Sequence, residues 1–311
     1  MKRLRTIFMG TPDFSVPCLA RLSEISEVAG VVTQPDKKRG RGQKLTPSPV
    51  KAFAQAHGWH VYQPQRIREE YFVTELEKLA PELIVVVAFG QILPQRILDI
   101  PTMGCINVHA SLLPRYRGAA PIQRCLMAGE PRTGVTTMFM DAGLDTGDIL
   151  LQEEVEIDAD MTMDVLHDRL SVIGADLLIK TITALIDGTV SRTKQDDSMS
   201  CYAEMLTKET GKLDWKNPAA ELHNLVRAMD SWPGAYAQLE GKTYKIWRTR
   251  VLAGEAGWKP GEVIRRTEQG LAVATGTGVI EILELQAPGK KRMSAADYLR
   301  GHAIPAHSVF M

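Results

Sequence analysis

Asn107 and His109 are polar residues two positions apart, at the end of a short apolar run that begins at Cys105. If residues 105–108 form a β-strand, the two side chains lie on the same face of it. A carboxamide beside an imidazole suits acyl transfer, because one group can stabilise an oxyanion while the other moves a proton. The spacing alone also fits a polar strand end that only makes structural hydrogen bonds, and both interpretations stay open at this point.

A second polar cluster, Asp141–Asp148, follows the apolar run 135–140. Its glycines allow the backbone to approach a ligand closely, and its carboxylates could orient an imidazole. The spacing of its acidic residues is not that of an EF-hand calcium loop, which also needs a distal Glu. By itself, a Gly-rich acidic segment is more typical of a turn.

The elements around these clusters predict an α/β fold. Strand-like apolar runs alternate with helical patterns, which indicates an open, Rossmann-like, doubly wound sheet over residues 1–188. Such sheets bind ligands at the carboxyl ends of their strands, where both polar clusters fall. The predicted strands are 4–9, 28–33, 83–88, 105–108 and 135–140, and the helices begin near 15 and 48 or span 67–79, 120–127 and 164–186.

The second part of the chain has a different pattern. Residues 189–205 are polar and rich in turn formers, and we expect them to form a linker. Residues 206–311 contain one helical segment and five short strand-like runs separated by turn signals. This pattern predicts a smaller, OB-like β-barrel domain.

Composition excludes several classes of protein. The 311 residues are 44% hydrophobic and 24% charged with no net charge, as in a globular protein. No apolar stretch reaches the length of a membrane span or a secretory signal, so we expect a cytoplasmic protein without membrane contact. The four scattered cysteines give no metal-binding spacing, and we expect no metal. Neither a dinucleotide fingerprint nor a P-loop is present.

Positive charge is concentrated in one segment of the first domain. Residues 37–51 contain six Lys and Arg and no acidic residue, and residues 206–311 carry 15 Lys and Arg against 11 Asp and Glu. A basic loop and a mildly basic second domain indicate an anionic partner. The alternative is a solvated charged turn, since Gly40 and Gly42 would also suit simple flexibility.

Longer motifs extend the two polar clusters. Residues 109–114, His-Ala-Ser-Leu-Leu-Pro, continue into Arg-Tyr-Arg-Gly at 115–118, and the Asp141–Asp148 loop follows downstream. Together they resemble the folate-dependent formyltransferase family. Four more segments are similar to the branch of that family whose acceptor is methionyl initiator tRNA, and the resemblance covers essentially the whole chain. These segments are 8–14, 33–36, 44–51 and 231–235.

The resemblance implies a formyl donor, 10-formyltetrahydrofolate, and an acceptor, the α-amine of the methionine on initiator tRNA. It implies that Asn107, His109 and Asp145 form the catalytic trio, with Asp145 setting the tautomer and orientation of the imidazole. We expect the chain to act as a monomer. The matching folate-contacting segment is Ser111, Leu112, Leu113 and Pro114, and the candidate tRNA contacts are Lys38, Arg39, Arg41, Lys44 and Lys208.

Two other functions fit parts of the sequence. A formyltransferase acting on an amino sugar nucleotide would share the trio and a similar C-terminal barrel, but a small sugar needs no loop of cations, whereas a tRNA acceptor stem does. A non-catalytic RNA-binding protein on a degenerate enzyme fold is the other. The presence of Asn107, His109 and Asp145 argues against it, because binding alone does not require those groups.

Overall fold

The computed structural model describes residues 3–39, 44–254 and 257–311 of the chain. The chain folds into two compact units that are interleaved in sequence. The first unit comprises Met1–Gly118, Arg132–Val155 and His167–Ala203; the second comprises Ala119–Pro131, Glu156–Leu166 and Glu204–Met311. The predicted break at 189–205 coincides with the last change of unit, at 203/204, but two earlier segments of the chain also pack with the C-terminal region.

The first unit is built on a seven-stranded sheet in the order β10-β9-β7-β6-β1-β2-β5. The pairs from β5 through β2, β1 and β6 to β7 are parallel, and β9 runs antiparallel to β7. This is the doubly wound, Rossmann-like sheet that the sequence predicted. The strands are β1 Leu4–Gly10, β2 Ser26–Val32, β5 Val61–Tyr62, β6 Leu83–Val87, β7 Cys105–His109, β9 Arg132–Phe139 and β10 Ile149–Glu156.

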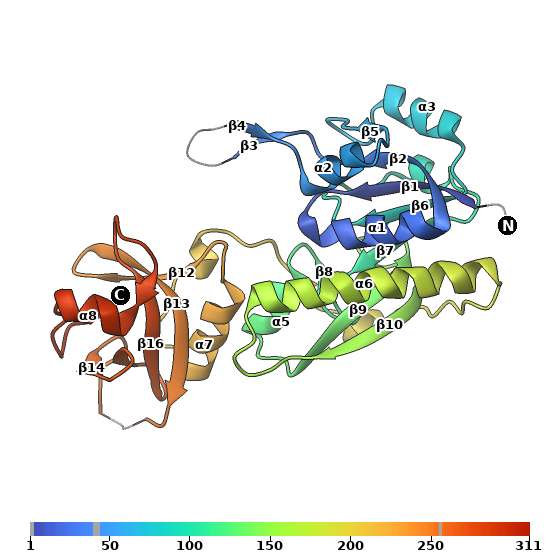
Figure 1. Ribbon diagram of the computed structural model, residues 1–311. Coiled ribbons are helices and arrows are strands. Elements are labelled where there is room, and N and C mark those ends of the chain that lie inside the picture. The colour runs from blue at the N-terminus through green and yellow to red at the C-terminus, as the bar shows by residue number, and fades with distance from the viewer. Residues whose placement is uncertain (1–2, 40–43, 255–256) are drawn as a thin grey trace. The chain divides into compact units, whose positions relative to one another are not determined.

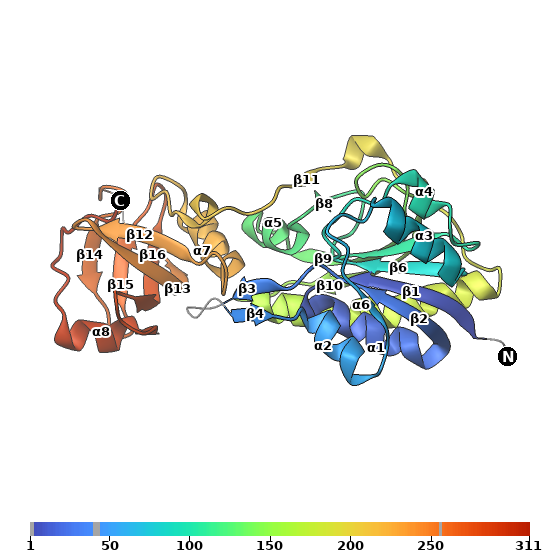
Figure 2. The same cartoon turned by 90° about the horizontal axis from the view of Figure 1, so that it is seen from above.

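Helices cover both faces of this sheet (Figure 2). On one face, Ile7, Met9, Ile84 and Val86 pack in one buried cluster with side chains of α3 and α4. On the other face, Gly174 of α6 lies against β7 and β9. Because both faces are covered, β6 is buried at all five positions and is apolar throughout. The helices are α1 Val16–Ile25, α2 Pro49–Ala56, α3 Glu70–Leu79, α4 Gln95–Leu98, α5 Pro121–Met127 and α6 Met163–Ile186.

The basic segment of the first unit is a β-hairpin. Strands β3, Lys37–Arg39, and β4, Lys44–Thr46, pair antiparallel and extend away from the sheet (Figure 1). At its base, Lys51 Nζ lies 2.7 Å from Asp36 Oδ2. The hydrogen bond from Lys51 is the main reason why the pKa of Asp36 is below its ordinary value. The hairpin therefore begins at a fixed, charge-paired residue.

The expected linker packs along the first unit instead of crossing solvent. Thr193 forms a β-bridge with Ile149, and β11, Tyr202–Ala203, pairs parallel with β8, Arg117–Gly118. Residues 191–200 are exposed apart from Gln195, which is buried.

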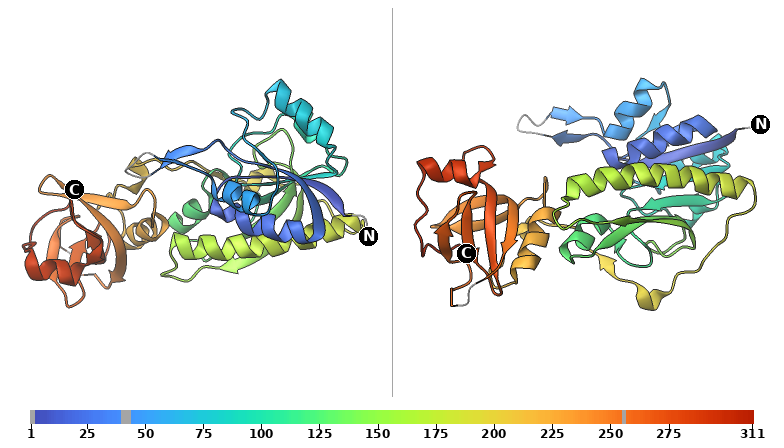
Figure 3. Two further views of the ribbon diagram at one scale, coloured as in Figure 1. Left: turned by 45° about the horizontal axis from the view of Figure 1, so that its top comes forward. Right: turned by 60° about the horizontal axis from the view of Figure 1, so that its bottom comes forward.

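The second unit is an antiparallel sheet in the order β12-β13-β16-β15-β14, with β17 paired to β16. Near the C-terminus, Val309 bridges to Glu262 and Phe310 to Leu239, so the tail joins both edges of the sheet as a barrel requires. Figure 3 shows that the strands of this sheet, drawn in orange, curve around one another. The elements are α7 Ala219–Ala228, β12 Ala235–Leu239, β13 Lys242–Leu252, β14 Val263–Arg266, β15 Leu271–Ala274, β16 Val279–Gln286, β17 Met293–Ser294 and α8 Ala295–Gly301.

An ion pair with one buried partner ties β13 to β16. Arg250 Nη2 lies 2.5 Å from Glu281 Oε2, and the Glu281 side chain is only 2% exposed. Removal of the arginine would leave a buried carboxylate without its counter-ion. We expect Arg250→Ala to lower the free energy of unfolding by about 2 kcal/mol, less than for a fully buried pair because Arg250 is half exposed. Arg248→Ala, at an exposed position of the same strand, is the control in urea melts, and equal stability of the two variants would contradict the assignment.

The four cysteines, all within described ranges, form no disulfide; Cys18, Cys105 and Cys125 are buried and Cys201 is exposed. Burial raises the pKa of both Cys18 and Cys105 to about 12, so at pH 8 about one in ten thousand of these thiols is ionised. We expect a maleimide to label one thiol per native chain at pH 8, at Cys201, and four after denaturation. Rapid labelling of a second native thiol would contradict this.

Candidate active site

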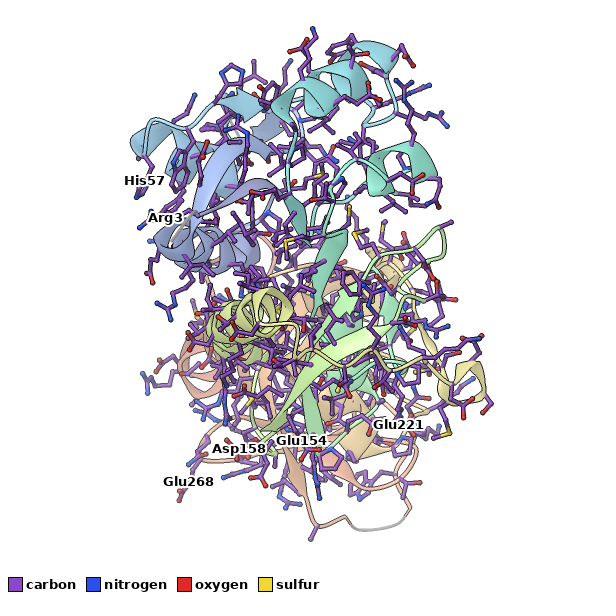
Figure 4. The ribbon with its side chains drawn as sticks, turned by 90° about the vertical axis from the view of Figure 1, so that its right-hand side faces the viewer. Arg3, His57, Glu154, Asp158, Glu221 and Glu268 are labelled. Carbon is purple, nitrogen blue, oxygen red and sulfur yellow. The ribbon has the colours of Figure 1, made fainter. Side chains whose placement is uncertain are left out.

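Asn107 and His109 lie at the carboxyl end of β7, in the interior of the first unit. Asn107 and His109 are 8% and 6% exposed and occupy alternate positions of the strand, with Val108 between them. Both are held by neighbouring strands, since β7 pairs with β6 on one side and β9 on the other. By contrast, Arg3 and His57, labelled in Figure 4, are exposed polar residues of the same unit.

Asp145 completes the group from the loop between β9 and β10. Its Oδ2 accepts a hydrogen bond from the backbone N–H of Gly118 at 2.8 Å, and its Oδ1 lies 3.4 Å from Asn107 Nδ2. Its Oδ2 is also 3.7 Å from His109 Nδ1. The structure therefore brings together all three side chains that the sequence placed in the trio.

The imidazole of His109 is oriented by a backbone carbonyl. His109 Nε2 lies 2.8 Å from the carbonyl oxygen of Tyr116, a group that can only accept, so Nε2 carries a hydrogen. At 3.7 Å, Asp145 is too far from Nδ1 for a hydrogen bond but close enough to pair with a protonated ring. We predicted that Asp145 sets the tautomer of His109, but in the structure the Tyr116 carbonyl holds the hydrogen on Nε2. Asp145 instead faces Nδ1, the ring nitrogen that has no hydrogen in this tautomer.

The segment 111–114 follows β7 and is fixed by hydrogen bonds to neighbouring residues. Ser111 is fully buried, with its hydroxyl donating to the carbonyl of Arg115 at 2.7 Å. Leu113 is buried too, and its carbonyl accepts a hydrogen bond from Gln152 Nε2 at 2.9 Å. Leu112 and Pro114 are partly exposed. Of the four predicted folate contacts, these two can present side-chain surface, while Ser111 and Leu113 hold the segment in place.

The predicted tRNA contacts fall in different parts of the fold. Lys38 is an exposed residue of β3, and Arg39 and Lys44 are paired positions of the β3–β4 hairpin. Arg41 lies outside the described residues. Lys208 is exposed and belongs to the second unit.

Sequence reasoning missed the groups that hold the trio. The carbonyl of Tyr116 and the N–H of Gly118 are backbone groups, so no residue type announces them. Positive φ angles of 60° at Tyr116 and 117° at Gly118 turn these groups towards the site. Gln195 was assigned to the linker, yet it contacts the loop that carries Asp145. The only available signal was the Arg-Tyr-Arg-Gly motif at 115–118.

Comparison with known proteins decides the family. The family model "Formyl transferase" matches residues 3–182, and "Formyl transferase, C-terminal domain" matches residues 205–303. The methionyl-tRNA formyltransferase of Geobacter metallireducens is 54% identical over 302 residues, which are 97% of this chain and 96% of that protein. That of Geobacter sulfurreducens is 55% identical over 305 residues, 98% of this chain and 96% of that protein.

The chain belongs to the methionyl-tRNA formyltransferase family.

Solved structures confirm the formyltransferase fold. WlaRD, a sugar 3N-formyltransferase, aligns with a TM-score of 0.68 at 20% identity, covering 94% of this chain and all of that one. HypX from Aquifex aeolicus, solved with tetrahydrofolic acid, aligns with a TM-score of 0.64 at 17% identity and covers 96% of this chain and 47% of that one. At these identities the similarity shows the fold of both units, and it does not indicate which acceptor the chain uses.

Two further properties concern a metal site and a membrane span. Within those ranges, no three His, Cys, Asp or Glu side chains gather closely enough to hold a metal ion. No helix there combines the length and apolar character that a membrane crossing requires.

Proposed function

We propose that this chain transfers the formyl group of 10-formyltetrahydrofolate to the α-amine of methionine on initiator tRNA. The observation that carries the proposal is the half-identical sequence shared with methionyl-tRNA formyltransferases over nearly their full lengths. The buried Asn107, His109 and Asp145 at a strand end supply the groups that such a transfer requires.

Each member of the trio has a separate task in the proposed reaction. As the amine adds to the formyl carbon, negative charge develops on the formyl oxygen, and the Asn107 amide is a donor placed to stabilise it. His109 exchanges a proton through Nδ1, because Nε2 is committed to the Tyr116 carbonyl. Asp145 then faces the protonated imidazole at 3.7 Å and stabilises its charge. The bond between the formyl carbon and folate N10 then breaks. The attacking nitrogen loses a proton and N10 gains one, so that formyl-methionyl-tRNA and tetrahydrofolate are formed.

The segment 111–114 is suited to contact the folate. Thr136 accepts a hydrogen bond from Leu113 N at 3.1 Å and donates to the carbonyl of Ser111 at 2.6 Å. Because backbone and buried side chains are tied back to β9, the partly exposed Leu112 and Pro114 form a rigid apolar edge next to His109. An edge of this kind can pack against the flat face of a pterin ring.

The tRNA is proposed to meet the basic β3–β4 hairpin and Lys208. In the second unit, Arg248 is 67% exposed and lies 3.9 Å from Glu284, a weak pair that leaves it able to contact phosphate. Arg250 is committed to Glu281 and is therefore a poor candidate. We expect Arg248→Ala to flatten the slope of log affinity for tRNA against log salt by somewhat less than one unit, with preference among tRNAs unchanged. An unchanged slope in salt-titrated binding would mean that Arg248 does not touch the tRNA backbone.

We further propose that the chain acts as a monomer in the cytoplasm, where charged initiator tRNA and the folate donor are present. Residues 1–188 and 206–311 would then supply catalysis and tRNA binding as separate domains joined by 189–205. The two family models, which meet this chain at 3–182 and 205–303, support that division.

Acceptor competition tests the proposed function. The enzyme is given labelled 10-formyltetrahydrofolate with equal concentrations of methionyl initiator tRNA and an amino sugar nucleotide. We expect label only in the tRNA, with kcat/KM at least about a thousandfold higher, because the hairpin cations contribute only to the larger acceptor. Preferential labelling of the sugar would establish the alternative activity, and folate binding without transfer to either acceptor would support a non-catalytic role.

A further inference from the structure

Gln195 is a buried polar residue in the segment that sequence patterning assigned to the linker. It is 7% exposed. Its Nε2 donates to two backbone carbonyls of the Asp145 loop, that of Asp145 at 2.9 Å and that of Gly147 at 2.8 Å. A primary amide has two N–H hydrogens, and here each has a carbonyl partner.

The carbonyl end of the same amide is held by Arg117. Gln195 Oε1 accepts from Arg117 Nε at 3.0 Å and from Nη2 at 2.7 Å. Arg117 belongs to β8, and its backbone N–H donates to the carbonyl of Cys201 in the returning segment. Donors and acceptors of the Gln195 amide are thus all engaged, a network with little freedom to shift.

The side chain and the main chain of Asp145 are both connected to β8 by hydrogen bonds. Its carboxylate receives the N–H of Gly118, the residue after Arg117, while its main-chain carbonyl is held through Gln195 by the Arg117 side chain. The position of Asp145 relative to β8 is therefore defined at both its backbone and its side chain.

The Asp145 loop has a conformation that needs such support. Asp145 has φ of 55°, in the left-handed region that non-glycine residues adopt only at an energetic cost. A Cβ at Gly147 would lie 1.8 Å from the carbonyl oxygen of Phe139, so the turn passes very close to the end of β9. Without the Gln195 amide, the carbonyls of Asp145 and Gly147 would lose the donor that they share.

We propose that Gln195 is a positioning residue for catalysis, which fixes the Asp145 carboxylate against Asn107 and His109 from within the interdomain segment. The inference rests on the proposed role of Asp145 in formyl transfer. It assigns a catalytic contribution to a part of the chain whose composition suggests only a connection.

Gln195→Ala removes both donors, and we expect it to lower kcat about 10- to 100-fold with KM for folate and tRNA within twofold, since a displacement of about 1 Å can cost that much. Gln195→Glu keeps an acceptor for Arg117 but turns a carboxylate towards two carbonyls, and it should lose at least as much. The matched control is Thr275→Ala: the Thr275 hydroxyl is also buried and also lies 2.8 Å from two carbonyls of one turn, those of Thr277 and Gly278, in the second unit. It should leave kcat unchanged.

A double-mutant cycle separates positioning from a general structural role. In the Asp145→Ala background, Gln195→Ala should change the residual single-turnover rate less than twofold, because its effect acts through the missing carboxylate. A full 10- to 100-fold loss in that background, or near-normal kcat of Gln195→Ala alone, would overturn the proposal. If Asp145→Ala by itself retains normal kcat, the proposed site fails and the positioning role fails with it. A Gln195→Ala defect seen only in KM would assign the residue to binding and likewise overturn the proposal.

Discussion

His109→Ala is expected to lower kcat by about 10²–10⁴-fold while Tm and folate binding remain close to those of the native chain. We propose that the imidazole transfers the proton. Its Nε2 is occupied by the Tyr116 carbonyl, so removal of the ring removes the available Nδ1. The measurement is kcat for formyl transfer at saturating folate and tRNA.

The same assay extends to the other two members of the trio. Asn107→Ala should cost about 10²–10³-fold in kcat through loss of an oxyanion donor. Asp145→Asn should cost at least as much, because the amide keeps an oxygen for Gly118 but no charge to face the imidazolium. Near-normal turnover in any two of the three variants would remove this site assignment.

Neutralising the β3–β4 hairpin is expected to have the second largest effect. With Lys37, Lys38, Arg39, Arg41 and Lys44 all changed to alanine, kcat/KM for methionyl initiator tRNA should fall about 10²–10³-fold at physiological salt, and KM for folate should not change. Each phosphate contact that is lost should also flatten the salt dependence by somewhat less than one unit. Steady-state kinetics at several salt concentrations measure both effects.

Two controls sharpen the hairpin experiment. Lys78→Ala with Lys180→Ala removes exposed cations from α3 and α6, where they pair with Glu75 and Glu153, and should leave tRNA kinetics unchanged. A minimal aminoacyl acceptor without the acceptor stem should be formylated equally by the native chain and the hairpin variant. An equal loss with that acceptor would show that the hairpin serves catalysis or folate binding instead.

The shared face of Asn107 and His109 could be predicted from the sequence, because side chains alternate strictly along a strand. Once 105–109 form a strand, Asn107 and His109 must share a face, and the carboxyl end of β7 must face the ligand side of a doubly wound sheet. The same rule does not place Asp145, because β9 runs antiparallel to β7 and its last residue, Phe139, pairs with Ile106. Asp145 reaches Asn107 through the loop that follows β9.

The contacts that fix these side chains could not be predicted. The carbonyl of Tyr116 and the N–H of Gly118 act through backbone geometry, which residue identity does not specify. Gln195 lies in a polar stretch, and composition does not distinguish a buried, fully hydrogen-bonded amide from a solvated one. Sequence likewise does not reveal that Arg250 pairs with Glu281, because the two residues lie on different strands.

The division of the chain into two units could be predicted only in part from the sequence. The sequence predicts a change of pattern near residue 189, and the strands of the second sheet begin at β12, Ala235–Leu239. Local periodicity cannot show, however, that residues 119–131 and 156–166 pack with the second unit, because such contacts join segments far apart in the sequence, for example 66 residues apart at Arg227 and Met161.

Formyl transfer from folate to the methionyl α-amine is tested most directly by identifying the amino acid carried by the tRNA after the reaction. The enzyme is incubated with labelled 10-formyltetrahydrofolate and methionyl initiator tRNA, the aminoacyl ester is hydrolysed, and the released amino acid is examined by mass spectrometry. We expect labelled N-formylmethionine from the native chain, and formation slowed at least about a hundredfold by His109→Ala. Unformylated methionine from the native chain, or equal formation by the His109→Ala variant, would contradict it.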